Sequence, residues 1–165
     1  MHHDPAPGPP ALSDIEIRRL VGEIAADSPA AEAAWQSLRG LGPAVAPYLL
    51  EAYPAARRWQ ARTALVFHAI GHARVSEQAF ALGLKALQDK SYMVRYRACM
   101  VLAYSLRPDA IPALTALLQH PDSRTREDAD RALDAIRSRN HHYFIDRQHS
   151  GRSFWVVNDT DRQSG

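Results

Sequence analysis

Three histidines and an aspartate lie close together near the C-terminus, and these residue types bind divalent metal ions. They are His141, His142, Asp146 and His149. A zinc site needs three or four such ligands in a fixed geometry, and HExxH or paired CxxC spacings commonly provide it. Neither spacing occurs in this sequence. We therefore expect polar surface or tail contacts from these side chains, with no metal and no cofactor.

Two other groups contain the residue types of a reactive site. His68 and His72 are four residues apart, as metal-binding pairs on one helix face are, but no third ligand lies nearby in the sequence. Cys99 lies beside Arg95 and Arg97, whose charges favour a thiolate, but it has no evident catalytic partner. Glycine-rich phosphate loops and GxSxG motifs are absent. We predict no catalytic residues, a core position for His68 and a structural role for Cys99.

The composition indicates one ordinary globular domain. The chain has 165 residues, 46% of them hydrophobic and 23% charged, and a single cysteine, so it needs no disulfide to bury a core. The net charge is +2, from 20 basic and 18 acidic residues, and this balance does not require a nucleic-acid partner.

The two ends of the chain differ from its middle. Residues 1–11 are rich in proline and lack both a basic n-region and an apolar core, so we expect a disordered segment and not a signal peptide. No run approaches the roughly 20 apolar residues of a membrane span. These features favour a cytoplasmic protein with no membrane partner.

Helix signals fill residues 12–140. Residues 13–16, Ser-Asp-Ile-Glu, match a capping box, and apolar residues follow at helical spacing. Similar starts and stops predict eight helices beginning near residues 14, 29, 43, 55, 75, 91, 108 and 123. Aromatic and β-branched stretches at 142–146 and 154–158 then predict a β-hairpin or extended tail over 141–165.

A short pattern recurs in the predicted helices. Val94-Arg95-x-x-Ala98-x-x-Val101-Leu102 aligns with residues 125–133 and 57–65, and a degenerate copy occupies 30–38. This pattern resembles the HEAT repeats, in particular the short HEAT-like repeats named after phycobilisome lyases. The resemblance implies an all-α fold, an α-solenoid of about four HEAT-like helix pairs. The C-terminal hairpin would then cover one open end of the stack.

A partner surface is expected on the second helix of each pair, which usually lines the concave side of such a stack. Counting the first residue of each copy as zero, positions 2, 5, 6 and 9 point away from the core. Trp, Tyr and Arg are the residues most enriched in binding hot spots. The predicted partner-binding residues are Trp35, Trp59, Arg62, Tyr96, Met100, Glu127 and Arg131. An error of one residue in register would instead pack the tryptophans between helices.

Three classes of function remain open. The first is a non-catalytic protein–protein interaction module, either a scaffold or a cognate inhibitor such as an immunity protein that blocks a toxin. The second is a nucleic-acid-binding HEAT-like protein that uses the arginine group Arg57, Arg58, Arg62, Arg95 and Arg97. The third is an enzyme or enzyme subunit, since the lyases that name the repeat attach bilin pigments to proteins. Nothing beyond the repeat supports that chemistry, and no small-molecule substrate is evident.

Overall fold

The computed structural model describes Pro5 and residues 11–162, and over these residues the chain contains eight α-helices and no β-strand. The helices are α1 (Asp14–Ala25), α2 (Ala31–Leu38), α3 (Ala46–Ala52), α4 (Trp59–Ala69), α5 (Glu77–Ala86), α6 (Tyr92–Ser105), α7 (Ile111–Leu117) and α8 (Ser123–Arg137). Short 3-10 turns join several of them. The disordered segment predicted for residues 1–11 lies almost entirely outside the described residues.

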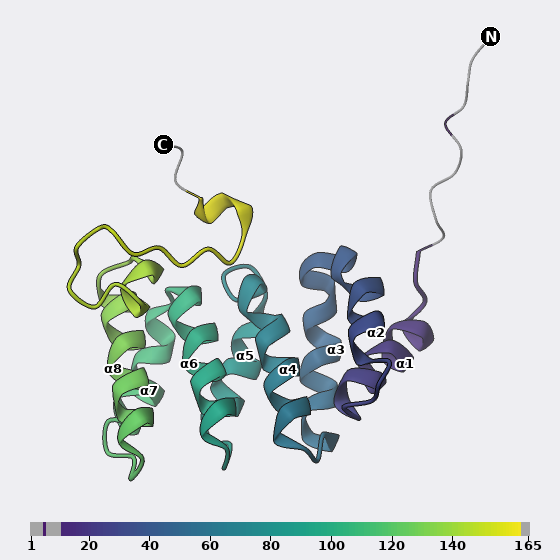
Figure 1. Ribbon diagram of the computed structural model, residues 1–165, viewed down its shortest axis with the longest axis horizontal. Coiled ribbons are helices and arrows are strands. Elements are labelled where there is room, and N and C mark those ends of the chain that lie inside the picture. The colour runs from purple at the N-terminus through teal and green to yellow at the C-terminus, as the bar shows by residue number, and fades with distance from the viewer. Residues whose placement is uncertain (1–4, 6–10, 163–165) are drawn as a thin grey trace.

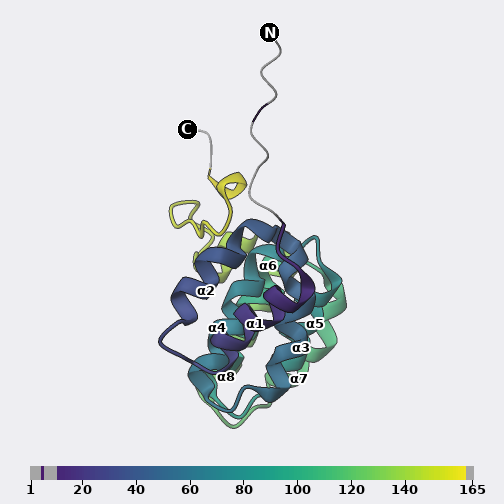
Figure 2. The same ribbon diagram turned by 90° about the vertical axis from the view of Figure 1, so that its right-hand side faces the viewer.

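The helices form two layers that run along the molecule (Figure 1). Seen from one end, α2, α4 and α8 lie on one side, and α3, α5 and α7 lie on the other (Figure 2). Each helix packs against its partner in the pair, and α6 also packs against α4 and α8. This arrangement confirms the all-α class and agrees with the predicted solenoid. None of the helices in the described part of the chain is long and apolar enough to cross a membrane.

Side chains at the helix starts explain several of the boundaries. The hydroxyl oxygen of Ser13 accepts the amide hydrogen of Glu16, as the capping box predicts. Ser76 caps α5 and Asp122 caps α8 in the same manner. The helix predicted to begin near residue 29 begins at Ala31, although the Ser28 hydroxyl accepts the amide hydrogen of Ala30 at 3.1 Å. Side-chain caps therefore set the starts of α1, α5 and α8.

Small residues let the helices approach closely within one continuous core. Ala98, Ala129 and Ala132 are fully buried between neighbouring helices. At Gly83 in α5, an added Cβ would lie 2.6 Å from a methyl carbon of Val101 in α6. The contact between these two helices therefore requires glycine at that position.

The second repeat starts one helical turn later than the sequence alignment predicts. Arg62, Arg95 and Arg126 are each the fourth residue of their helix. Each donates from Nη1 to the carbonyl oxygen six residues earlier, at 3.3, 2.9 and 2.7 Å respectively. The repeat arginine of the second copy is therefore Arg62 and not Arg58. Residues 61–69, and not 57–65, match the segment 94–102, so that alignment was wrong.

The predicted C-terminal β-hairpin is also wrong. Residues 141–144 form a 3-10 turn, because the side chain of Asn140 accepts the amide hydrogen of His142 at 3.0 Å. The Asp146 carboxylate then closes a loop by accepting the amide hydrogens of Ser150 and Gly151. These local acceptors replace the ladder that two paired strands would need.

The tail lies along the edge of the stack instead of covering its end. It leaves α8, passes over α6 and reaches the region above α4 and α5 (Figure 1). The amide nitrogen of the Asn158 side chain donates to the carbonyl oxygen of Gly71, directly after α4, at 2.9 Å. The tail thus contacts repeats distant in the sequence.

Candidate partner-binding face

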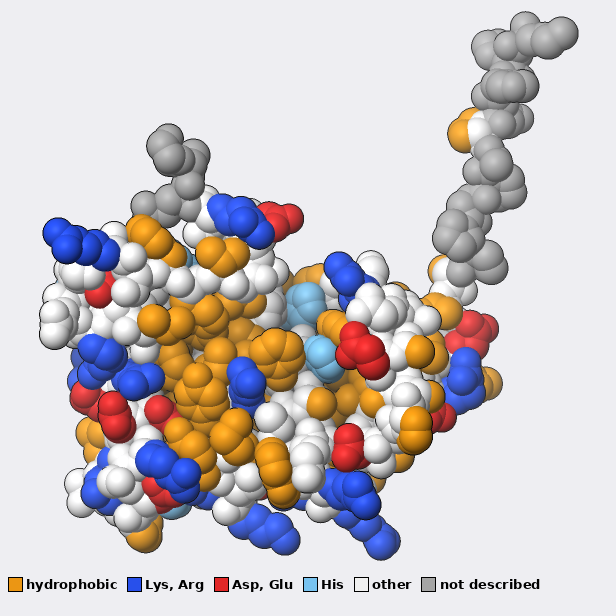
Figure 3. All heavy atoms as spheres, viewed as in Figure 1, with side chains coloured by type: hydrophobic (Ala, Val, Ile, Leu, Met, Phe, Trp, Pro, Cys, Tyr) orange, Lys and Arg blue, Asp and Glu red, His pale blue; other side chains and the backbone are white. Residues whose placement is uncertain are grey.

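The surface formed by α2, α4, α6 and α8, which we call the even-helix face, carries the residues with the strongest binding character. Figure 3 shows apolar side chains gathered over its middle, with charged side chains around them and histidines beside a hollow. Phe67 in α4 is 47% exposed although it is a large apolar residue. Tyr92 and Tyr96 of α6 are half-buried and their rings stack at 6.2 Å. Exposed aromatic surface of this kind commonly marks an interface.

Arg97 lies among these aromatic side chains without a counter-ion. Its guanidinium carbon is 4.7 Å from the centre of the Phe67 ring and 5.5 Å from that of Tyr96. Its Nη1 approaches the sulfur of Met100 at 3.4 Å. No carboxylate of the described residues lies within 4.0 Å of it, and its buried Nε has no hydrogen-bond partner among them. The face therefore combines apolar area with the uncompensated positive charge of Arg97.

A groove of about 420 Å³ lies between the C-terminal tail and the even-numbered helices, and we call it the tail groove. Trp35, Phe67 and Met100 line its helical side, and residues 155–158 form its other wall. Its lining includes Arg39, His68 and His72, and no aspartate or glutamate. The groove is therefore largely apolar with the positive charge of Arg39, because burial lowers the pKa of both histidines.

His68 supports the groove by stacking on Trp35. The two ring centres are 3.6 Å apart and the planes differ by 13°. Burial lowers the pKa of His68 to about 4, so the imidazole is neutral at physiological pH. His68 was expected in the core with a hydrogen bond, but it lies at the groove and makes its main contact through the face of its ring.

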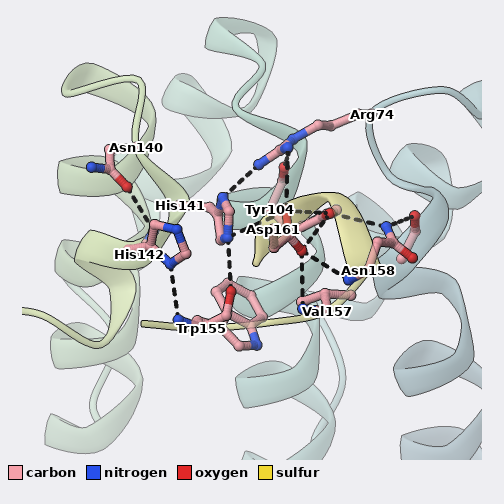
Figure 4. Close-up of polar contacts among 10 residues, drawn as sticks. Arg74, Tyr104, Asn140, His141, His142, Trp155, Val157, Asn158 and Asp161 are labelled. Atoms are coloured by element: carbon pink, nitrogen blue, oxygen red, sulfur yellow. Dashed lines mark hydrogen bonds and ion pairs between the residues drawn. The ribbon is translucent and has the colours of Figure 1, made fainter. Parts of the chain in front are cut away.

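The tail wall of the groove is held by buried polar groups (Figure 4). The Asp161 carboxylate accepts from the Tyr104 hydroxyl at 2.9 Å and from the amide hydrogens of Val157 and Asn158 at 3.0 and 2.8 Å. Burial alone would raise the pKa of Asp161, but the two backbone hydrogen bonds and the Tyr104 hydroxyl lower it. Asp161 is therefore an ionised anchor for the end of the tail.

Two histidines hold the middle of the tail through the backbone of Trp155. Arg74 donates to Nδ1 of His141 at 2.7 Å, which leaves Nε2 protonated to donate to the carbonyl oxygen of Trp155 at 2.8 Å. Nδ1 of His142 accepts the amide hydrogen of Trp155 at 2.9 Å. Burial lowers the pKa of His141 and favours this neutral form.

The residues considered as metal ligands form hydrogen bonds that hold the tail. His149 lies 2.7 Å from Asp134, and Asp146 binds the loop amides described above. Across the described residues, no group of three or more His, Cys, Asp or Glu side chains has a geometry that would hold a metal ion. Cys99 is fully buried, and burial raises the pKa of its thiol. The positive charges of its neighbours therefore do not produce a reactive thiolate.

The predicted partner-binding residues on the even-helix face lie in three places. Trp35 and Met100 line the tail groove, and Tyr96 lies beside them through its contact with Arg97. Trp59 is 44% exposed at the first turn of α4, which is the opposite end of that helix from the groove. Glu127 and Arg131 form an ion pair on α8 at 3.2 Å. Met100 itself is only 7% exposed, so it contributes to the floor of the groove.

Arg62 does not face a partner, which corrects the sequence expectation. It is 8% exposed, and its Nε donates to Asp89 at 2.7 Å. The register error explains the difference, because the four-residue shift moves Arg62 from an outward position to that of the structural repeat arginine. The same shift gives the outward position to Phe67, which the sequence analysis missed.

The five arginines of the nucleic-acid alternative do not act together on one surface. Arg62 and Arg95 are buried and paired with Asp89 and Asp122. Arg97 lies against Phe67, as described above. The exposed members are Arg57 and Arg58, and Arg58 lies 3.6 Å from Asp27. The group therefore does not form the continuous basic stripe that is typical of phosphate binding.

Comparison with known protein families gives a match for part of the chain. Residues 81–141 match the family model described as HEAT repeats, and this span includes α6, α7 and α8. The resemblance to HEAT repeats is therefore confirmed for this part of the chain. HEAT repeats generally mediate protein–protein interactions and are typically non-catalytic. A comparison with curated proteins found no match.

Proposed function

We propose that this chain is a non-catalytic protein-binding module that holds its partner on the even-helix face. The observation that carries the proposal is Arg97, an unpaired cation lying on the exposed ring of Phe67 and beside Tyr96. Aromatic residues and arginine dominate binding hot spots, because they combine large apolar area with directional polar contacts. The groove beside them extends this surface over α2 and the tail.

Site-specific photo-cross-linking in the source cell tests the location of the partner. A photoreactive phenylalanine analogue replaces Phe67 in one variant and Ile15 in another, since Ile15 is 80% exposed but lies on α1, outside the even-helix face. We expect one dominant cross-linked protein from position 67 and none from position 15. Equal labelling from both positions, or none from position 67, would contradict the proposal.

Substitutions then test the energetics with the captured partner. Phe67→Ala and Tyr96→Ala should each weaken binding by about tenfold or more, as hot-spot truncations do, whereas Ile15→Ala should leave the affinity unchanged. Circular dichroism of each variant checks that the helices are retained. Folded Phe67 and Tyr96 variants with unaltered affinity would remove this face from the interface.

A cognate inhibitor, such as an immunity protein for a toxin, is a narrower form of the same proposal. The exposed ring of Phe67 and the unpaired Arg97 on the even-helix face, which suit a tight contact with one partner, support this role. An equimolar amount of the chain should then abolish the activity of the captured partner, and Phe67→Ala should restore it. A partner that remains fully active in the complex would favour the scaffold role instead.

Nucleic-acid binding is separated from these roles by a titration with duplex DNA at two salt concentrations. Binding through phosphates weakens steeply as salt rises. Because Arg62 and Arg95 are committed to buried ion pairs, we expect no saturable binding at physiological salt. Tight, salt-sensitive binding would instead support the arginine-based alternative.

A further inference from the structure

The tail segment around Trp155 has one bonded edge and one free edge. The amide hydrogen and the carbonyl oxygen of Trp155 are both bonded to the histidines on one side, and the chain runs nearly straight here (Figure 4). In extended backbone, the polar groups of adjacent residues point to opposite sides. Those of Phe154 and Val156 therefore point away from the histidines, and they form no hydrogen bond with any described residue.

The side chains alternate along the same segment as they do in an edge strand. Trp155 is 9% exposed and packs against Tyr104 and Phe144, whereas Phe154 and Val156 are 47% and 45% exposed. A strand edge with unpaired polar groups is a template for another extended chain. Here the anchoring of Trp155 by His141 and His142 holds that template in place without a neighbouring strand.

The tail groove lies directly beside this segment. Trp155 and Val156 belong to its lining, opposite Phe67 and Met100. A chain that pairs with the segment would point alternate side chains into the groove, which offers them apolar walls.

The positive charges beside the groove indicate which kind of peptide would bind there. The groove lining contains Arg39, whose only side-chain hydrogen bond among the described residues goes to Gln36, and it contains no carboxylate. Arg97 contacts Phe67 and Met100 at the groove border and lacks a counter-ion. A carboxylate beside an apolar side chain complements both features.

We propose that an extended peptide segment of a protein partner adds as a strand along residues 154–156. It inserts a large apolar or aromatic side chain into the tail groove and directs an adjacent carboxylate to Arg97 or Arg39. This inference rests on the proposed protein-binding function and specifies the part of the partner that is recognised.

A random 12-residue peptide library displayed on phage is the probe. Selection on the purified chain should enrich peptides with an aromatic or large aliphatic residue next to Asp or Glu. Synthetic copies of the enriched peptides then give affinities by fluorescence polarisation. No enrichment, or enrichment of basic peptides, would overturn the inference.

Val156 provides a matched pair of variants for the backbone contact. Val156→Pro removes the amide hydrogen, which is free in the structure, while Val156→Ala retains it and loses comparable side-chain volume. We expect the proline variant to bind the selected peptide about tenfold more weakly than the alanine variant, because a strand hydrogen bond is lost. Equal affinities would show that no strand is added.

Two further measurements use the wild-type chain and single-charge changes. Peptide binding should slow hydrogen exchange at the amides of Phe154 and Val156, and unchanged exchange at both would contradict strand addition. Arg97→Gln together with Arg39→Gln should weaken the acidic peptide and leave its Asp→Asn or Glu→Gln analogue unaffected. Equal losses for both peptides would exclude the charge contact.

These outcomes are distinguishable from failure of the proposed function. If cross-linking from position 67 captures a partner whose affinity is insensitive to Val156→Pro, the even-helix face binds protein without strand addition. If position 67 captures nothing, the proposed function itself fails.

Discussion

The guanidinium of Arg62 and the carboxylate of Asp89 meet at 2.7 Å and tie α4 to the connection that precedes α6. Arg95 and Asp122 repeat this contact one helix pair later, at 3.4 Å. In each case, the arginine also binds a carbonyl oxygen of the connection preceding its own helix. One side chain thus joins its own helix to the connection before it and to the corresponding connection of the next helix pair.

The first prediction concerns this contact. Arg62→Ala should lower the free energy of unfolding by about 3 kcal/mol, because it leaves the buried Asp89 carboxylate without its positively charged partner. Arg58→Ala is the matched control, since the Arg58 side chain is 71% exposed and its loss should cost less than about 1 kcal/mol. Urea unfolding measures both values. If Arg58→Ala lowered the free energy of unfolding more than Arg62→Ala did, the alignment of residues 57–65 with 94–102 would be supported instead.

The second prediction concerns acid stability. The pKa of His68 is lowered to about 4 in the folded chain, so the unfolded chain binds this proton first as the pH falls below about 6.5. Stability is therefore fully present above pH 6.5 and falls between about pH 6.5 and 4, by about 2–3 kcal/mol from this residue. The lowered pKa values of His72 and His141 act in the same direction.

His68→Phe is the variant that tests this assignment, because it keeps an aromatic ring on Trp35 and removes the titrating group. Its free energy of unfolding should decline less steeply than that of the wild type between pH 7 and 5. Parallel declines would assign the acid sensitivity to other groups.

The third prediction concerns Cys99. The thiol is fully buried and its pKa is raised by burial, so a thiol-specific reagent should react only when the chain unfolds. Absorbance of released thionitrobenzoate should stay at baseline in native buffer and reach one equivalent in denaturant. Rapid stoichiometric reaction in native buffer would show that the thiol is accessible.

The fourth prediction concerns the tail anchor. Asp161→Asn removes the charge that accepts three hydrogen bonds, so the tail should detach and trypsin should cleave faster after the exposed Arg152. Asp159→Asn is the control, since the Asp159 side chain is 99% exposed. Mass spectrometry of timed digests measures the cleavage rate of each variant. Identical cleavage rates would mean that Asp161 does not hold the tail.

Much of the helical array was predictable, because local signals determine its elements. The capping box at Ser13 and the cap at Asp122 both form. The repeat register failed for a physical reason. Residues four apart share a helix face, so Ala61 and Leu65 satisfy the apolar pattern in either of two alignments. The equal spacing of Arg62 to Arg95 and of Asp89 to Asp122 was a signal that could have decided between them.

The tail was predictable in composition but not in conformation. Its aromatic and β-branched residues favour strands, but a strand forms only where a second strand supplies the ladder. Here the backbone of Trp155 bonds to the side chains of His141 and His142. The backbone amides of Val157 and Asn158 donate to the carboxylate of Asp161. Such long-range contacts leave no periodic trace in the sequence. For the same reason, the groove between the tail and α4 could not be foreseen.

An array whose units touch only their immediate neighbours can unravel from either end, one unit at a time. In this chain, hydrogen bonds join the C-terminal tail to earlier repeats. Asn158 bonds to Gly71 and Tyr104, and His141 bonds to Arg74. The last helix pair cannot unfold separately until these hydrogen bonds between distant repeats break. Melting should therefore be a single cooperative event in the wild type, and a truncation before residue 141, which removes all of these contacts, should convert it into a gradual loss from the C-terminal end.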